Sequence, residues 1–167
     1  TMKNLILILF LFGITTPLIA QIIELPEVFI NPDKYKYIYE VAGDAKDENV
    51  KNLEMEIAKF DVTKQEYYDD EYDTYTVSFY IPQGYAVAVY DGEGNLLRTI
   101  ERYRNVKLPI AVSQAIAKRF PQWTLEKDIY KVIFNEKKWN AKKVYKLKLT
   151  NGEKSLKVKT DEEGNFL

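Results

Sequence analysis

One segment of the chain occurs twice, 70 positions apart, and this repeat constrains the fold more than any other feature. Residues 75–97 (YTVSFYIPQGYAVAVYDGEGNLL) align without a gap with residues 145–167 (YKLKLTNGEKSLKVKTDEEGNFL). A helical pattern of apolar residues precedes each copy, at residues 50–60 and 109–120. Because an internal repeat indicates a repeated structural unit, we predict an α+β fold that is a tandem repeat of helix plus antiparallel β-sheet.

The first twenty residues have the pattern of a secretory signal. Lys3 gives a positive start, residues 5–14 are almost wholly apolar, and Ala20 ends the segment. The apolar run is shorter than the roughly 20 residues that span a membrane, and it is typical of a cleaved signal peptide. We therefore predict a signal peptide at residues 1–20, cleavage after Ala20, and a periplasmic or secreted protein that is not membrane-embedded after cleavage.

The rest of the chain is expected to form three parts. We predict N-terminal strands and a linker at residues 21–48, a first helix-sheet unit at 49–104, and a second helix-sheet unit at 105–167. The first part contains an apolar run at 22–30 and an alternating tyrosine pattern, both of which indicate strands. The tyrosines in question are Tyr35, Tyr37 and Tyr39. They are expected to form an aromatic face that packs in the core or covers the first sheet, or else a platform for a carbohydrate or peptide.

The hairpin in the second copy is signalled by Asn-Gly at residues 151 and 152, the strongest short turn signal. A two-residue turn at this place predicts the register of the two strands. The expected cross-strand pairs are Leu147 with Leu156, Tyr145 with Val158, and Lys146 with Lys157. The resulting lysine face is either solvated, with its long stems covering the sheet, or binds an anionic partner, the acidic first unit included.

Charge is divided unevenly along the chain, although the net charge is −1. Residues 21–100 contain 17 acidic and 7 basic residues, whereas residues 101–167 contain 8 acidic and 16 basic ones. Charged surfaces of opposite sign attract each other or a charged partner. The two halves are expected to complement each other, or one of them to meet a charged partner.

Tyrosines and acids cluster at residues 67–75 (YYDDEYDTY), immediately before the first copy of the repeat. Tyrosine is enriched at protein interfaces because it combines apolar area with a hydroxyl group. A solvated loop and a Ca²⁺ site are the alternatives for this cluster. We predict that a protein or peptide partner binds here and on the neighbouring sheet face, at Tyr67, Tyr68, Asp69, Asp70, Tyr72, Asp73, Tyr80 and Tyr85.

Several kinds of chemistry are excluded or unsupported by composition. The chain has no His and no Cys, which removes Ser-His-Asp and Cys-His nucleophiles, the usual zinc sites and disulfides. No phosphate-binding glycine loop is present. A hydrolase that uses two carboxylates stays open in principle. We therefore predict no catalytic residues, no metal, no cofactor and no nucleic-acid partner.

The run LPIAVSQAIAKRFPQW, followed by strands and by the turn in TDEEGNFL, resembles PepSY-like domains of secreted bacterial proteins. These domains are related in fold to the β-lactamase inhibitor protein, and the resemblance covers residues 44–167. The signal and the stretch YTVSFYIPQG resemble proteins of Bacteroidetes-type bacteria. The resemblance implies a non-catalytic binding module that inhibits or regulates a peptidase or another envelope enzyme. A structural or assembly component of the cell envelope is the alternative, and a carboxylate-only hydrolase is the remote one.

Overall fold

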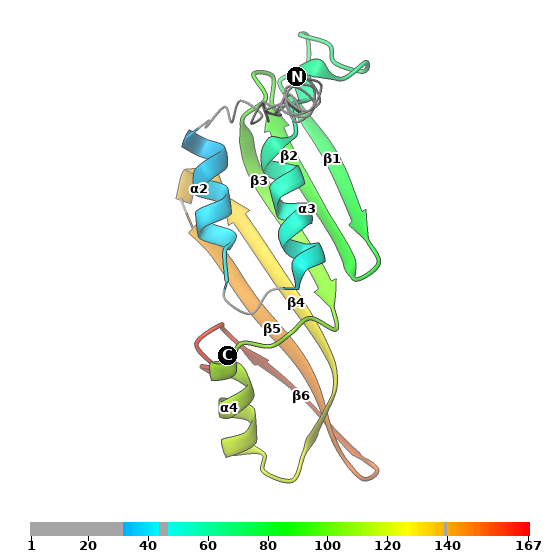
Figure 1. The fold of residues 1–167 in the computed structure, drawn as a ribbon, viewed down its shortest axis with the longest axis vertical. Coiled ribbons are helices and arrows are strands. Elements are labelled where there is room, and N and C mark those ends of the chain that lie inside the picture. The colour runs from blue at the N-terminus through cyan, green and yellow to red at the C-terminus, as the bar shows by residue number, and fades with distance from the viewer. Residues whose placement is uncertain (1–31, 44–46, 139) are drawn as a thin grey trace, which may run out of the picture.

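The computed structural model describes residues 32–43, 47–138 and 140–167. The predicted signal peptide and the predicted strand at 22–30 lie outside these residues. The described chain is an α+β fold with one six-stranded antiparallel sheet, whose strands lie side by side in chain order (Figure 1). The strands are β1 (Thr74–Ile81), β2 (Gly84–Asp91), β3 (Leu96–Arg104), β4 (Thr124–Asn135), β5 (Asn140–Asn151) and β6 (Lys154–Thr160).

The helices all lie in front of the sheet in Figure 1, so the described residues form two layers. α2 (Pro32–Val41) and α3 (Glu48–Lys59) lie side by side, and α4 (Ile110–Arg119) lies at the other end of the molecule. The buried apolar side chains form one continuous core between the helices and the sheet. The opposite surface, here called the outer face, carries no helix in the part of the chain that the structure describes.

Both helices that the sequence predicts are present. α3 begins after Asp47, whose carboxylate accepts a hydrogen bond of 2.9 Å from the Asn49 N–H and so satisfies one free donor of the first turn. Its buried side includes Val50, Leu53 and Ile57, as the apolar spacing indicates. α4 covers the predicted range 109–120 except its first and last residues.

The predicted strand with Tyr35, Tyr37 and Tyr39 is wrong, because these residues lie on helix α2. Tyr37 and Val41 are one helical turn apart and buried, whereas Tyr35 and Tyr39 are exposed. Aromatic residues at every second position lie on one face of a strand, but in a helix they alternate between two opposite faces. The same pattern therefore fits a helix as readily as a strand. Pro32 suits the first helical position, where its missing N–H costs nothing. Since α2 packs on the helix side of the sheet, these tyrosines do not cover the outer face.

The register predicted for the second hairpin is also wrong, by two residues. Asn151 pairs with Lys154, Leu147 with Val158 and Tyr145 with Thr160, so the turn consists of Gly152 and Glu153. Gly152 has φ of 60° and Glu153 is not left-handed, which fits a type II′ turn with glycine at its first central position. Because the shift is an even number of residues, the side chains keep their predicted faces.

The repeat has a common local geometry in its two turns. In each turn the Asp carboxylate accepts a hydrogen bond of 2.8 Å from the Asn N–H four residues later, at Asp91–Asn95 and at Asp161–Asn165. Gly94 and Gly164 have φ of 82° and 84°. The rest of the two units differs, because β4 lies between α4 and β5 and no strand takes that place between α3 and β1. The six strands form one sheet rather than two separate ones.

Substitution of the two turn glycines should have unequal effects. Both need a left-handed backbone, which costs a residue with a side chain about 1–2 kcal/mol. A Cβ at Gly164 would lie 2.7 Å from the Ala111 carbonyl oxygen of α4, whereas the nearest atom to a Cβ at Gly94 is 3.4 Å away. We expect Gly164→Ala to lower the free energy of unfolding by about 2–4 kcal/mol and Gly94→Ala by about 1–2 kcal/mol. Chemical denaturation of both variants measures this; equal losses would mean that α4 does not pack on this turn.

Candidate functional site

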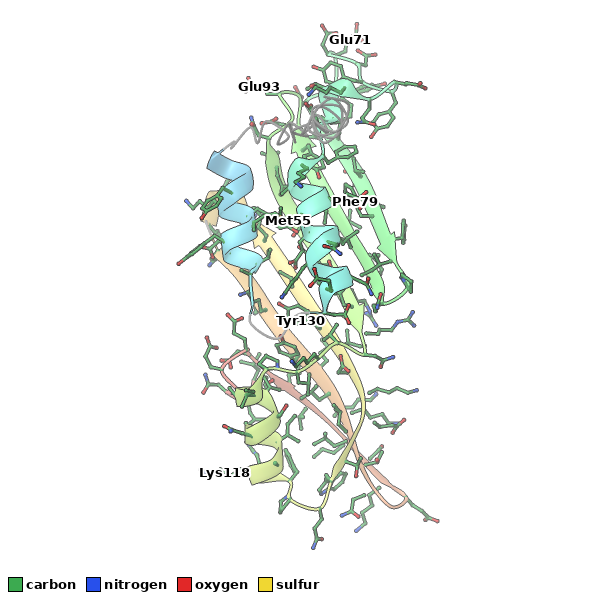
Figure 2. All side chains as sticks on the ribbon, viewed as in Figure 1. Met55, Glu71, Phe79, Glu93, Lys118 and Tyr130 are labelled. Atoms are coloured by element: carbon green, nitrogen blue, oxygen red, sulfur yellow. The ribbon has the colours of Figure 1, made fainter. Side chains whose placement is uncertain are left out.

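The acidic tyrosine loop, here defined as residues 66–73, connects the short helix η1 (Val62–Lys64) to β1 and is not part of a hairpin. It lies at one end of the molecule, where Glu71 is labelled in Figure 2. Its three aspartates, at positions 69, 70 and 73, are exposed, as are Tyr67 (56%) and Tyr72 (61%). The loop therefore presents carboxylates and aromatic rings to solvent.

Two tyrosines, Tyr68 and Tyr75, hold part of this loop against the sheet. The Tyr75 hydroxyl donates to the Asp69 carbonyl oxygen and accepts a hydrogen bond of 2.9 Å from the Asp69 N–H. Tyr68 stacks on Tyr75, with ring centroids 5.6 Å apart, and its hydroxyl donates to the Gly92 carbonyl oxygen at 3.0 Å. Of the predicted loop residues, Tyr68 is therefore mainly a packing residue. Tyr67 and Tyr72 are more than half exposed, although the Tyr72 ring also packs edge-on against Tyr75, with ring centroids 6.2 Å apart.

The other two predicted residues lie at the opposite end of the first hairpin. Tyr80 and Tyr85 face each other across β1 and β2, with ring centroids 6.3 Å apart. Tyr80 is 75% exposed and Tyr85 38%, both on the outer face. Thr74 and Tyr80 are six residues apart on an extended strand, a span of about 20 Å. The eight predicted residues thus form two groups rather than one continuous site.

The outer face of the second half of the sheet is strongly basic. Side chains of like charge lie directly across from each other on neighbouring strands, in the pairs Arg102–Lys131, Lys146–Lys159 and Lys148–Lys157. Pairs of this kind destabilise a sheet. Coulombic repulsion by neighbouring cations, that of Lys131 foremost, holds the pKa of Lys146 below its ordinary value. Lys148 makes a salt bridge of 2.8 Å with Glu126. The lysine face predicted from the sequence is therefore present, with corrected partners.

The sequence analysis missed a buried carboxylate in the core. Glu101 is fully buried on β3 and accepts hydrogen bonds from three hydroxyl groups, those of Tyr37 (2.9 Å), Thr99 (2.7 Å) and Tyr103 (2.8 Å). Burial raises the pKa of both tyrosines. The available signal was the alternation along β3, which places Glu101 on the same face as Thr99 and Tyr103. Because these groups have no contact with solvent, they join α2 to the sheet rather than meeting a substrate.

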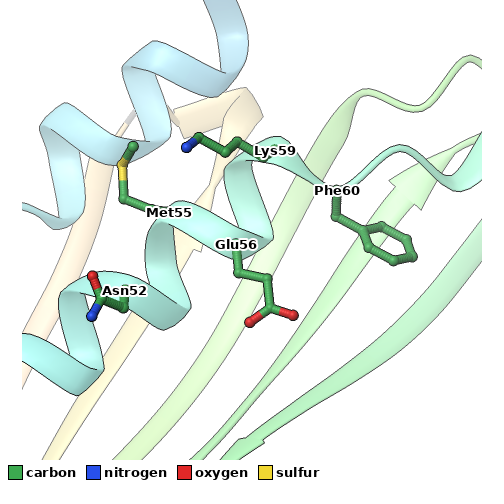
Figure 3. Close-up of a pocket in the computed structure, with 5 residues that line it drawn as sticks. All are labelled: Asn52, Met55, Glu56, Lys59 and Phe60. Carbon is green, nitrogen blue, oxygen red and sulfur yellow. The ribbon is translucent and has the colours of Figure 1, made fainter. Parts of the chain in front are cut away.

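A shallow hollow lies on the surface of α3. It is lined by Asn52, Met55, Glu56, Lys59 and Phe60 (Figure 3). It contains one carboxylate and one amine, and it has no paired carboxylates such as glycoside hydrolysis requires. In the described ranges, no three carboxylates come together in a way that could bind a metal ion. No described helix has the length and apolar composition to cross a membrane.

No protein-family model matches the chain, and no curated protein matches it.

Proposed function

We propose that this protein is a periplasmic or secreted binding module without catalytic activity, which binds a protein or peptide. The observation that carries the proposal is the exposure of four tyrosines, two at each end of the first hairpin. Tyr80 and Tyr85 lie on the outer face, and Tyr67 and Tyr72 lie in the acidic tyrosine loop. Contiguous exposed apolar patches mark interaction sites, and tyrosine is a frequent anchor of protein interfaces.

The lack of a recognisable chemical site among the described residues supports binding rather than catalysis. The chain has no His or Cys, and the buried carboxylate Glu101 is enclosed by hydroxyl donors. The hollow on α3 is shallow, whereas ligand sites are clefts that bury most of the surface of a small ligand. A structural role in the cell envelope is the second candidate, and the basic outer face, with its three cross-strand pairs of like charge, is the observation that favours it.

We further propose that the fold is a tandem repeat related to PepSY-like domains and to the β-lactamase inhibitor protein. Support comes from the two turns that follow β2 and β6, which share their hydrogen bonds and the conformation of their glycines. A helix precedes each hairpin. In such a protein, restraint of a peptidase or another envelope enzyme is the role that we propose for the binding.

Three double variants test the proposed function. Tyr67→Ala with Tyr72→Ala removes the exposed loop rings, and Tyr80→Ala with Tyr85→Ala removes the outer-face pair. Tyr35→Ala with Tyr39→Ala is the matched control, because these tyrosines are also exposed, at 65% and 71%, but lie on α2. Each variant is used to capture partners from an envelope extract, and the captured partner is then identified, purified and titrated against it.

We expect at least one of the first two variants to weaken binding about tenfold or more, as hot-spot tyrosines do, with a melting temperature near that of the wild type. The control variant should bind like the wild type. Equal binding by all three variants would contradict the proposed site. A separate Tyr68→Ala variant should lower the melting temperature, since Tyr68 packs on Tyr75.

A further inference from the structure

The two edge strands of the sheet differ in how they are protected. β6 (KSLKVKT) carries three lysines, and the Lys159 carbonyl oxygen accepts a hydrogen bond of 3.0 Å from the Leu167 N–H. Charged side chains and covering contacts of this kind prevent a sheet edge from pairing with other chains. β1 (TYTVSFYI) has eight residues without a charge, and among the described residues it pairs with β2 alone. Its edge lacks the protection that β6 has.

The direction of the free backbone groups on β1 follows from one hydrogen bond. The Asp73 carbonyl oxygen accepts a hydrogen bond of 3.1 Å from the Gly92 N–H, so residue 73 directs its backbone groups toward β2. Successive residues of an antiparallel strand alternate in this respect. Thr74, Thr76, Ser78 and Tyr80 therefore direct their N–H and C=O groups away from the sheet. These four residues offer a row of donors and acceptors to a further strand.

We propose that the edge of β1 binds an extended segment of a partner polypeptide as a seventh strand of the sheet. This inference rests on the proposed function and specifies its mode of binding. Strand addition of this kind derives affinity from main-chain hydrogen bonds, and specificity from side chains that alternate between the two faces.

The charges around β1 define the chemistry of the partner segment. The acidic tyrosine loop leads directly into β1 and exposes Asp69, Asp70 and Asp73 there without a basic residue among positions 65–73. Tyr80, at the far end of the strand, is 75% exposed. Complementary charges select partners and fix their register. The segment bound by β1 thus alternates apolar residues along its length and carries Lys or Arg at the end that lies beside the loop.

Replacement of Ser78 by proline should specifically prevent a further strand from pairing with the edge of β1. Ser78 directs its N–H away from β2, so Ser78→Pro removes an edge donor and adds bulk there while the β1–β2 hydrogen bonds stay; proline is tolerated at such edge positions. Ser78→Ala is the side-chain control. Lys157→Pro is the matched control on β6, where Lys157 has the same outward orientation as Lys159.

The experiment selects binders from a display library of random nine-residue peptides on the full chain and measures their affinities for the wild type and the three variants. We expect enriched peptides with alternating apolar residues and Lys or Arg. Their affinity should fall at least tenfold for Ser78→Pro and change less than twofold for the two controls. In the wild type, bound peptide should slow amide hydrogen exchange at Thr76, Ser78 and Tyr80, a readout that does not depend on the variant's folding.

Several outcomes would overturn the inference. They are a lack of enriched peptides, peptides that bind Ser78→Pro as well as the wild type, and unchanged exchange at the three amides. A wild-type dimer that Ser78→Pro converts to a monomer would show that a second copy occupies the edge instead. If Ser78→Pro binds normally while the tyrosine double variants lose the native partner, the proposed function stands and strand addition fails. If no variant affects binding, both fail.

Discussion

Raising the pH above about 10 should unfold this protein cooperatively. Five tyrosines are almost completely buried, and burial raises the pKa of each above its ordinary value of about 10: Tyr37, Tyr90, Tyr103, Tyr130 and Tyr145. In the unfolded chain these hydroxyls ionise near pH 10, whereas in the folded protein they keep their protons. The stability that the neutral hydroxyls contribute is therefore fully present below pH 10 and is lost as the pH rises above it.

The expected loss is large because five groups act together. Each tyrosine lowers the free energy of unfolding by about 1.4 kcal/mol per pH unit above 10, and five of them by about 7 kcal/mol per unit. Such a loss is comparable to the whole stability of a typical domain. Tyrosinate absorbance and circular dichroism, recorded together during an alkaline titration, measure it. Ionisation of all 13 tyrosines with a native circular dichroism spectrum would contradict the prediction.

One variant checks that the buried tyrosines cause the alkaline transition. Tyr90→Phe removes a titrating hydroxyl that donates to the Ile57 carbonyl oxygen at 2.8 Å. It should lower stability at pH 8 by about 1 kcal/mol through the lost hydrogen bond. Above pH 10, its stability should decline less steeply than that of the wild type, by about 1.4 kcal/mol per pH unit.

Replacement of Glu101 by Ala should be the most destabilising single substitution that we predict here. It removes the acceptor of three buried hydroxyl donors, from Tyr37, Thr99 and Tyr103, and leaves a cavity under α2. Each buried donor without a partner costs about 1–3 kcal/mol. We expect a loss of about 3–5 kcal/mol in the free energy of unfolding, measured by denaturant titration.

Two further variants separate the contribution of the lost hydrogen bonds to stability from that of the cavity. Glu101→Gln keeps the volume and one carbonyl acceptor, and hydroxyl groups can rotate to accept from its amide, so about 1–3 kcal/mol is expected. Glu71→Ala, in the exposed acidic tyrosine loop, should change stability by less than about 0.5 kcal/mol. If Glu101→Ala proves as mild as Glu71→Ala, the hydroxyl cluster does not contribute to stability.

The candidate site was predictable in its parts but not in its arrangement. The cluster at residues 67–73 and the exposed faces of Tyr80 and Tyr85 follow from local composition and from strand alternation. The separation of these two groups by the length of β1 depends on where the loop enters the sheet. The packing of Tyr68 on Tyr75 likewise depends on a loop conformation that no local pattern specifies.

The sequence by itself determined those helices and turns whose sequence patterns extend over only a few neighbouring residues. α3 and α4 follow from the spacing of apolar residues, and α3 also from a capping residue. The hairpins follow from the alternation of apolar and polar residues and from turn residues. Each of these signals acts within a few residues of the chain. The two Asp-Xaa-Glu-Gly-Asn turns, at residues 91–95 and 161–165, also follow, since a left-handed glycine at a fixed offset defines the turn.

Only the tertiary structure decided which surfaces meet. Tyr35, Tyr37 and Tyr39 fit a strand and a helix equally well in isolation, and packing of Tyr37 against Phe134 and Glu101 selects the helix. The register of β5 and β6 depends on a choice between two adjacent turn positions that both contain Gly152. The contrast between the edges of β1 and β6 in the described residues arises only when all six strands join in one sheet, with these two strands at its edges. The pairing of strands depends on packing against cross-strand and same-face neighbours, and no single segment contains that information.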